Sequence, residues 1–325
     1  MALIYSLGLD LSEIKKIVFV EISDYKKAVG SRDLLSNIEI CRDISAALGK
    51  EFEFYSYREI NENIKNIEVM DCLDLRIYMK YFNEFRRLKI KPIFLCLAPE
   101  LSGIHGPNLL KINYGILKLR VELLFNVFLK FRVFNFYSMG IHGVRGVLFR
   151  ETPIDWDLFF EEIRKLREKL HEIKPEYFSI MARFNLNQSL LVVLPLAEHF
   201  GGSLEFNKEL FSIVEITASK MMDCQILVKN HPTDSEDYSM LASQYFPQSH
   251  LVVSKNVNEA NIPIELLIAN FQKLFFAGTF STSMYSFSSK AQNPALVFIP
   301  KLRAKWTNYS SGGALKMFQN TKYII

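Results

Sequence analysis

The chain lacks the short patterns that usually mark zinc sites and phosphate-binding glycine loops. Its cysteines form no CxxC or CxxH pair, and there is no Walker loop and no GxGxxG sequence. We therefore expect no metal site, and we expect the thiols to be reduced and to lie in or beside hydrophobic cores. The cysteines are Cys41, Cys72, Cys96 and Cys224.

Long uncharged hydrophobic runs are also missing. The longest apolar stretch, 116–134, is interrupted by five charged residues, which excludes a membrane-spanning helix there. Residues 1–16 contain acidic residues and no basic segment of the kind that opens a signal peptide. We expect a cytoplasmic protein. Its formal charge of +4 and pI of about 8.7 permit peripheral association with the anionic face of the inner membrane.

No dense basic patch, internal repeat or low-complexity segment occurs, and charges of both signs are mixed throughout. We therefore expect no nucleic-acid partner. The chain has 325 residues, of which 49% are hydrophobic, so it can bury the cores of two domains.

Short apolar runs alternate with longer amphipathic segments along the whole chain. Strands joined by helices of about ten residues or more predict parallel sheets with right-handed crossovers. The expected strands are 17–22, 52–57, 67–71, 92–97, 133–137, 190–194, 225–229, 250–254, 273–278 and 294–299. The expected helices are 34–48, 75–88, 107–129, 156–173, 207–222, 235–245, 263–271 and 281–291.

This alternation predicts an α/β protein made of two doubly wound, Rossmann-like domains that face a cleft. We place the boundary within 175–190, which gives an acceptor-side domain at 1–180 and a nucleotide-binding domain at 181–325. Ligands of such sheets bind at the carboxyl ends of the strands.

Two polar segments of the second domain follow expected strands directly. Lys229 ends the strand 225–229, and His231 and Pro232 follow it, where an imidazole can contact a phosphate or protonate a leaving group. The segment 279–283 follows Gly278, and its hydroxyls, with amides at the start of the next helix, suit an anion. The alternatives are a structural turn for the first segment and ordinary helix capping for the second. The hydroxyl residues are Thr279, Ser281, Thr282 and Ser283.

Between these segments, Glu265 lies at the start of an expected helix that Pro263 opens. Its carboxylate can accept hydrogen bonds from ribose hydroxyls or a base, or it can complement the helix dipole.

In the first domain, Glu100 and His105 follow the strand 92–97, and His142 follows the strand 133–137. Glu100 and His105 are candidate bases for deprotonating a sugar hydroxyl, against the alternative of a solvated loop. His142 is a third candidate base or an acceptor contact. Asp155 and Asp157 form a DxD pattern, but they stand at a helix start, where aspartates cap.

The second half resembles the bacterial polysialyltransferases and related sialyltransferases with the GT-B fold. The resemblance is carried by the segments ILVKNHP (226–232) and LFFAGTFSTS (274–283) and covers roughly the last 130 residues. It implies a GT-B-like, inverting and metal-independent transfer of sialic acid from CMP-sialic acid to a glycan of a capsule or lipooligosaccharide. The CMP-sugar is a donor substrate, and no cofactor is implied.

The same resemblance implies roles for individual residues. His231 would contact the donor phosphate and help CMP leave, and Ser281, Thr282 and Ser283 would bind that phosphate. The family has an acidic motif ending in glycine that supplies the base. This chain lacks the acidic pair, and Glu100, in Pro99–Gly103, stands at the corresponding place.

Two other interpretations stay open from the sequence. One is a transferase that uses CMP-Kdo or CDP-glycerol, although a diphosphate donor would be expected to bring more basic residues to 279–283. The other is an inactive nucleotide-binding scaffold of a polysaccharide assembly complex, which the missing acidic pair favours.

Overall fold

The structure is a computed structural model, and every structural statement below refers to the residues it describes. These residues are 4, 6–8, 16–21, 31–56, 59, 94–96, 134–138, 149–196, 202–221, 224–231, 237–247, 251–254, 261–279, 281–297 and 323–324.

The chain forms two compact units, each assembled from segments that are distant in the sequence. The first contains Met1–Asp10, Tyr55–Phe159 and Lys301–Gln319. The second contains Leu11–Phe54, Phe160–Pro300 and Asn320–Ile325. Helices alternate with strands along the chain, and the assigned registers of both larger sheets are parallel, so the expected α/β class with parallel sheets is confirmed. The two-domain GT-B arrangement and the division at 180 stay predictions.

The first unit has a three-stranded sheet in the order β3-β4-β5. Its strands are β3 (Phe94–Cys96), β4 (Phe134–Ser138) and β5 (Phe149–Pro153). The first two were expected from their apolar runs. The third was not, because its sequence FRETP is polar, and its pairing with β4 is what makes it a strand.

Helix α9 (Trp156–Ile173) has the predicted bounds. Asp155 Oδ1 accepts a hydrogen bond from Leu158 N at 3.0 Å, which confirms that this aspartate caps the helix. Lys165 Nζ lies 2.5 Å from Glu161 and 2.8 Å from Glu162 on the exposed face. The buried stripe has the spacing of an amphipathic helix and consists of Phe159, Ile163, Leu166 and Leu170.

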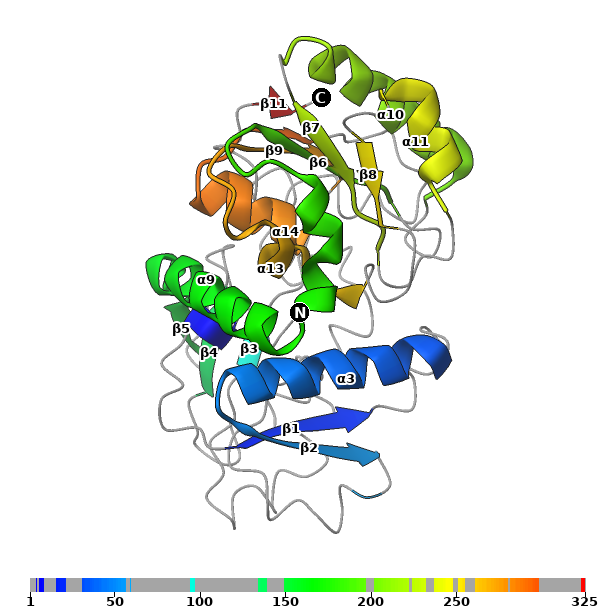
Figure 1. Cartoon of the computed structure of the whole chain (residues 1–325). Coiled ribbons are helices and arrows are strands. Elements are labelled where there is room, and N and C mark those ends of the chain that lie inside the picture. The colour runs from blue at the N-terminus through cyan, green and yellow to red at the C-terminus, as the bar shows by residue number, and fades with distance from the viewer. Residues whose placement is uncertain are drawn as a thin grey trace. The chain divides into compact units, whose positions relative to one another are not determined.

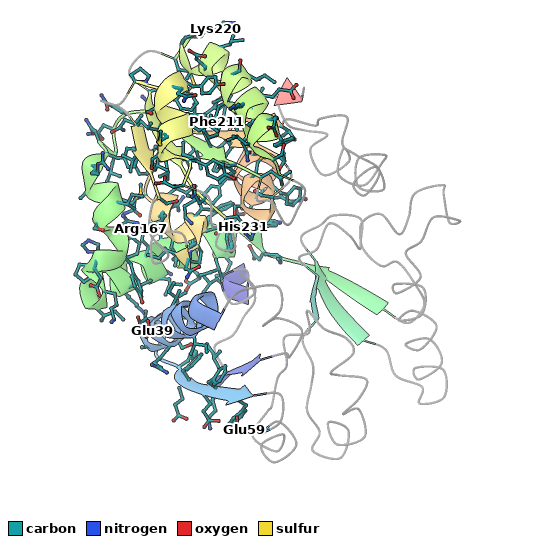
Figure 2. All side chains as sticks on the ribbon, turned by 90° about the vertical axis from the view of Figure 1, so that its right-hand side faces the viewer. Glu39, Glu59, Arg167, Phe211, Lys220 and His231 are labelled. Atoms are coloured by element: carbon teal, nitrogen blue, oxygen red, sulfur yellow. The ribbon has the colours of Figure 1, made fainter. Side chains whose placement is uncertain are left out.

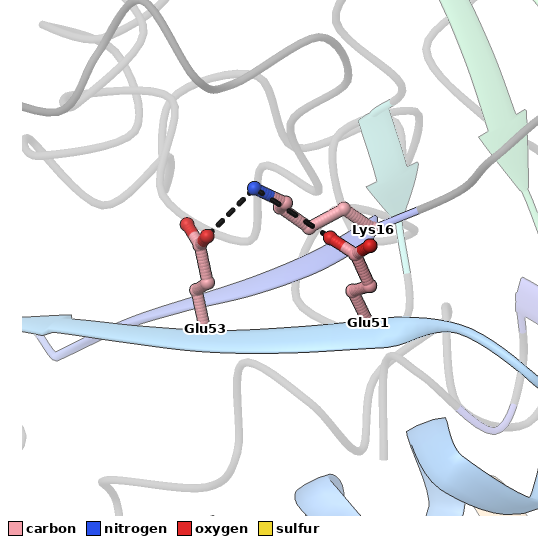
Figure 3. Close-up of polar contacts among 3 residues, drawn as sticks. All are labelled: Lys16, Glu51 and Glu53. Atoms are coloured by element: carbon pink, nitrogen blue, oxygen red, sulfur yellow. Dashed lines mark hydrogen bonds and ion pairs between the residues drawn. The ribbon is translucent and has the colours of Figure 1, made fainter.

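In the second unit, β1 (Lys16–Glu21) pairs with β2 (Glu51–Ser56). Figure 3 shows Lys16 reaching across to the carboxylates of β2, 2.6 Å from Glu53 and 3.9 Å from Glu51. These ion pairs are partly exposed and contribute little stability. They join side chains of neighbouring strands, as expected for opposite charges on paired strands.

Helix α3 (Ser31–Ala47) and the 3₁₀ helix η5 (Pro175–Arg183) also belong to the second unit. Tyr177 Oη donates a hydrogen bond of 2.5 Å to Asp43, and burial together with this bond raises the pKa of Tyr177 above its usual range. The segment 175–190 was expected to be a domain boundary. It contains η5, whose side chains Phe178, Ile180 and Met181 are buried, and the boundary within it stays a prediction.

The main sheet has six strands in the order β11-β10-β9-β6-β7-β8, and its assigned registers are parallel. The first strand of this sheet, β6, lies at its centre. The chain adds β7 and β8 on one side of β6 and then β9, β10 and β11 on the other, which is the doubly wound Rossmann order. The topological switch lies between β6 and β9. The strands are β6 (Leu190–Leu194), β7 (Gln225–Val228), β8 (Leu251–Val253), β9 (Leu274–Gly278), β10 (Ala295–Val297) and β11 (Tyr323–Ile324).

Helices cover both faces of this sheet. Figure 1 shows α10 (Leu204–Ala218) and α11 (Ser239–Tyr245) on one side, with α13 (Ile264–Ile268) and α14 (Thr282–Tyr285) on the other. On the second side, Phe287 stacks on Phe276 of β9 and meets Phe160 of α9 edge-on, with centroid distances of 5.6 and 5.4 Å. Strands β6 to β10 are accordingly almost entirely buried, as apolar parallel strands require.

Five predicted helices differ from their expected bounds. Helix α3 is shifted to Ser31–Ala47 from 34–48, and helix α11 begins at Ser239 and not at 235. Helix α10 begins at Leu204, because Ser203 caps it by accepting a hydrogen bond from Phe206 N. Helix α13 is shorter than 263–271. The helix expected at 281–291 is α14 followed by a π-helical turn, η8 (Ser286–Lys290). Among the described helices, none is both long and apolar enough to cross a membrane.

We predict that Phe211→Ala lowers the free energy of unfolding by about 3–5 kcal/mol. Phe211 is fully buried and contacts Tyr238, Tyr245 and Phe246 at centroid distances of 6.3, 6.1 and 5.7 Å (Figure 2). Urea unfolding measures the change. As a control, Leu204→Ala on the same helix removes a side chain that is 53% exposed, so the change should stay within about 0.5 kcal/mol. Equal losses would contradict this description of the core.

Candidate functional site

The segments after β7, β8 and β9 leave the main sheet at one edge. Val193 of β6 pairs with Val228 of β7 on one side and with Ala277 of β9 on the other. Because β7 and β9 both flank β6, their carboxyl ends lie two strand spacings apart, roughly 10 Å. The predicted site segments at 229–232 and 279–283 therefore start level with each other at the topological switch.

Gly278 ends β9 beside Leu194 of β6. A Cβ atom at position 278 would lie 2.8 Å from Leu194 O and 3.0 Å from Leu194 Cβ. Both of these atoms belong to a buried sheet, so neither can move cheaply. Only glycine allows the two strands to end this close together, and this fixes where the segment 279–283 begins.

Hydrogen bonds hold the backbone that carries His231. Lys229 N donates to Val193 O at 2.9 Å, and Asn230 N donates to Ser254 Oγ at 2.9 Å. Lys229 Nζ lies 3.3 Å from Asn230 O, and this lysine is only 5% exposed. His231 is half-buried and follows at the edge of the sheet (Figure 2). These bonds fix the path of the backbone up to His231.

The hydroxyls after β9 have different partners. Ser281 Oγ accepts a hydrogen bond from Met284 N at 3.0 Å, so Ser281 caps the helix, as the capping alternative predicted. Its O–H group can still donate to an anion. Ser283 Oγ donates to Glu265 Oε1 at 2.6 Å, so its proton is used within the protein in this state. Thr279 is buried.

The Ser283–Glu265 hydrogen bond joins two of the predicted site segments. Glu265 is fully buried in the first turn of α13. A buried carboxylate is costly unless charge-assisted hydrogen bonds stabilise it. The bond therefore holds the start of α13 against the start of α14 at the carboxyl edge of β9.

The helix after β9 changes from α to π geometry at Ser286. Lys290, in its last turn, lies 5.6 Å from the ring centroid of Tyr285. Burial raises the pKa of Tyr285 to about 12 and lowers the pKa of Lys290. Tyr285 therefore stays protonated near neutral pH.

Buried polar side chains are concentrated at this edge. All of those described, except Ser45, Asn207 and Gln225, lie in the segments that follow β7, β8 and β9. Those at the edge are Lys229, Asn230, Ser254, Asn261, Glu265, Thr279 and Ser283, whereas Ser286 and Ser288 lie further along the helix after β9 and donate to carbonyls of that helix. Burying polar groups opposes folding unless they are bonded, so their concentration in one place indicates a site used for something other than stability.

The structure brings Glu265 and Ser283 into contact, with Ser281 two residues before Ser283 and Lys229 two residues before His231. Glu100, His105, His142 and Pro232 lie outside the described residues, as does the side chain of Thr282. Their predicted roles stay predictions.

The sequence reasoning did not single out Ser254 or Asn261. Ser254 stands at the carboxyl end of an expected strand, so the rule applied to 229–232 and 279–283 could have found it. Among the described residues, no group of three or more His, Cys, Asp or Glu side chains is placed to hold a metal ion.

No protein-family model and no curated protein matches the chain. Among solved structures, it is similar to MnaA of S. aureus in a co-structure with UDP. The identity is 11% and the TM-score 0.37, and the alignment covers 87% of this chain and 79% of the other. A similarity this weak supports no conclusion about fold or activity.

We predict that Gly278→Ala lowers the free energy of unfolding by about 1–3 kcal/mol, because the added methyl group forces β6 and β9 apart. Urea unfolding measures it. The control is Gly49→Asn: Gly49 has φ of +68° and nothing within 4 Å of an added Cβ. Asparagine tolerates that conformation, so the control should lose less than about 1 kcal/mol. A Gly278→Ala variant as stable as the unaltered protein would contradict the close contact.

We also predict that Ser254→Ala costs about 1–3 kcal/mol, because it leaves the buried Asn230 N–H without its acceptor. The matched control is Ser243→Ala, which removes an exposed hydroxyl and should cost less than about 0.5 kcal/mol. If both variants unfold at the same urea concentration, the Ser254 hydroxyl does not stabilise the backbone at Asn230.

Proposed function

We propose that the chain is an inverting, metal-independent glycosyltransferase that transfers sialic acid from CMP-sialic acid to a glycan. The proposed acceptor is a capsule or lipooligosaccharide chain. The proposed localisation is the cytoplasm, with peripheral attachment to the inner membrane.

The observation that carries the proposal is the concentration of buried polar side chains at the carboxyl edge of β7, β8 and β9. Doubly wound sheets bind nucleotides at this edge, next to the topological switch. Here the switch lies between β6 and β9, and the His231 segment and the hydroxyl segment stand on its two sides.

A single phosphate suits the groups found there. Ser281, backbone amides and one histidine can bind a monoanionic phosphodiester, whereas a diphosphate usually needs a metal ion or several cations. On the described part of the hydroxyl segment and the helix after it, the basic residue is Lys290, and it lies over the Tyr285 ring. This supports a CMP-linked donor over a diphosphate donor.

The proposed reaction breaks the bond between the anomeric carbon and the phosphate oxygen of CMP. The acceptor hydroxyl oxygen attacks the anomeric carbon from the opposite face, which inverts its configuration, and its proton goes to a base. His231 donates a hydrogen bond or proton to the departing phosphate oxygen. The base is proposed to be Glu100, and Glu265 is proposed to accept hydrogen bonds from the ribose hydroxyls.

For Glu265 to bind ribose, it must share its carboxylate with Ser283. A carboxylate has two oxygens and about four acceptor positions, and Ser283 uses one oxygen at 2.6 Å. The Ser283 bond holds the carboxylate in one rotamer before ligand arrives, which lowers the entropy cost of binding.

The test measures release of CMP from CMP-sialic acid by the purified protein in EDTA. CMP-Kdo, CDP-glycerol and UDP-sugars are assayed in parallel. We expect turnover of CMP-sialic acid alone, unaffected by EDTA. In His231→Ala, turnover should fall by at least about a hundredfold, because a positioned proton donor contributes about 10²–10⁴.

The control is His171→Ala on α9, which removes an exposed imidazole that packs against Phe178. It should keep turnover within about twofold. Turnover of a diphosphate donor instead would overturn the donor assignment. No turnover and no thermal shift with any cytidine nucleotide would overturn the proposed function and favour the scaffold interpretation.

A further inference from the structure

Asn261 carries a buried side-chain amide that no hydrogen bond within the protein explains. The residue is 5% exposed, and in the part of the chain that the structure describes neither Oδ1 nor Nδ2 has a hydrogen-bond partner. Buried amides in folded proteins are nearly always bonded, so an amide with both ends unbonded needs another explanation.

Two other buried amides show what a structural role looks like in this chain. Asn207 bonds to the backbone of Leu196 with both ends of its amide, at 3.0 and 3.1 Å, and also contacts Tyr238 Oη. Gln225 bonds to the backbone N and O of Asn185, at 2.6 and 2.7 Å. Each amide therefore holds a loop closed. The amide of Asn261 makes no such bond to any described residue, although it is about as buried.

The position of Asn261 connects it to the candidate site. It lies in the segment that links the carboxyl end of β8 to α13, four residues before Glu265. Four residues span at most about 14 Å. Because Glu265 is bonded to Ser283 at the carboxyl edge of β9, Asn261 must lie within this short reach of that edge.

The chemistry of an amide excludes the phosphate and, because the ribose hydroxyls are assigned to Glu265 in the proposed function, leaves the base. The amide presents a donor and an acceptor side by side, which matches the Watson–Crick edge of a nucleobase, where a donor and an acceptor are also adjacent. A phosphate offers only acceptors, so it would leave the amide oxygen unbonded.

We infer that Asn261 binds the base of the nucleotide, pairing its amide with the donor–acceptor edge of the pyrimidine. This inference rests on the proposed function and assigns a residue to base recognition within the same site. Since no described group fixes which way the amide faces, it can pair with cytosine or, turned over, with uracil. It therefore contributes affinity for a pyrimidine without choosing between the two.

The test compares Asn261→Leu with the unaltered protein in two measurements. The first is the dissociation constant of CMP by calorimetry, with ribose 5-phosphate as a competitor that has no base. We expect CMP binding to weaken by about tenfold to a hundredfold, and ribose 5-phosphate binding to change by less than about twofold. The second is the thermal midpoint without ligand, which we expect to be unchanged or higher, because an unbonded buried amide is replaced by an apolar group of similar size.

The matched control is Asn207→Leu, the same change at an amide that is fully bonded inside the protein. Its thermal midpoint should fall by at least about 3 °C. Asn261→Ala covers the case in which leucine does not fit, and it is judged by the binding of the two ligands alone, because its smaller side chain leaves a cavity that lowers the midpoint by itself.

The outcomes separate the inference from the proposed function. If the unaltered protein binds CMP and Asn261→Leu binds it equally well, the inference is wrong and the proposed function stands. If both ligands weaken alike, or if the midpoint falls as in Asn207→Leu, the amide has a structural role and the inference is also overturned. If the unaltered protein binds no CMP, both fail together.

Discussion

The burial of β6 on both faces and along both edges is the constraint on which the candidate site depends. Four of its five residues are fully buried, and it pairs with β7 on one side and β9 on the other. A strand held this way cannot shift its register without exposing apolar side chains. Its register with β7 and β9 therefore determines where along the strand direction Lys229 and Thr279 leave the sheet. It also determines the spacing of the two polar segments.

Around this apolar centre, the chain places groups that reduce its own stability. Glu265 and Lys229 place ionisable side chains in buried positions, and Asn261 buries an amide that finds no hydrogen bond among the described residues. Their cost is offset by the large apolar core on both sides of the sheet. Such a division, with stability supplied by strands and helices and specificity by the loops between them, is what a ligand-binding α/β protein requires.

The sequence predicted the second half of the fold well, because its strands are nearly uninterrupted apolar runs with clear boundaries. The bounds of β6 were predicted correctly from LLVVL. The sequence did not predict β5, whose residues FRETP become a strand only by pairing with β4. It also could not show that Ser283 donates to Glu265, since that contact joins residues 18 positions apart and depends on how two helices meet. The sequence did not single out Asn261, because it is one of three asparagines in 256–261 and stands two residues before a proline, in a composition typical of an ordinary turn.

The order of strands in the main sheet has a consequence for synthesis. β10 pairs with β9 on one side and with β11 on the other, and a long stretch of chain separates β10 from β11. When the ribosome has completed β10, the outer edge of that strand has unpaired N–H and C=O groups until the residues of β11 emerge. During that interval the growing chain presents an apolar edge strand, the feature that most readily pairs with another chain. The two-residue strand β11 therefore also covers an edge that would otherwise be open to pairing with another chain.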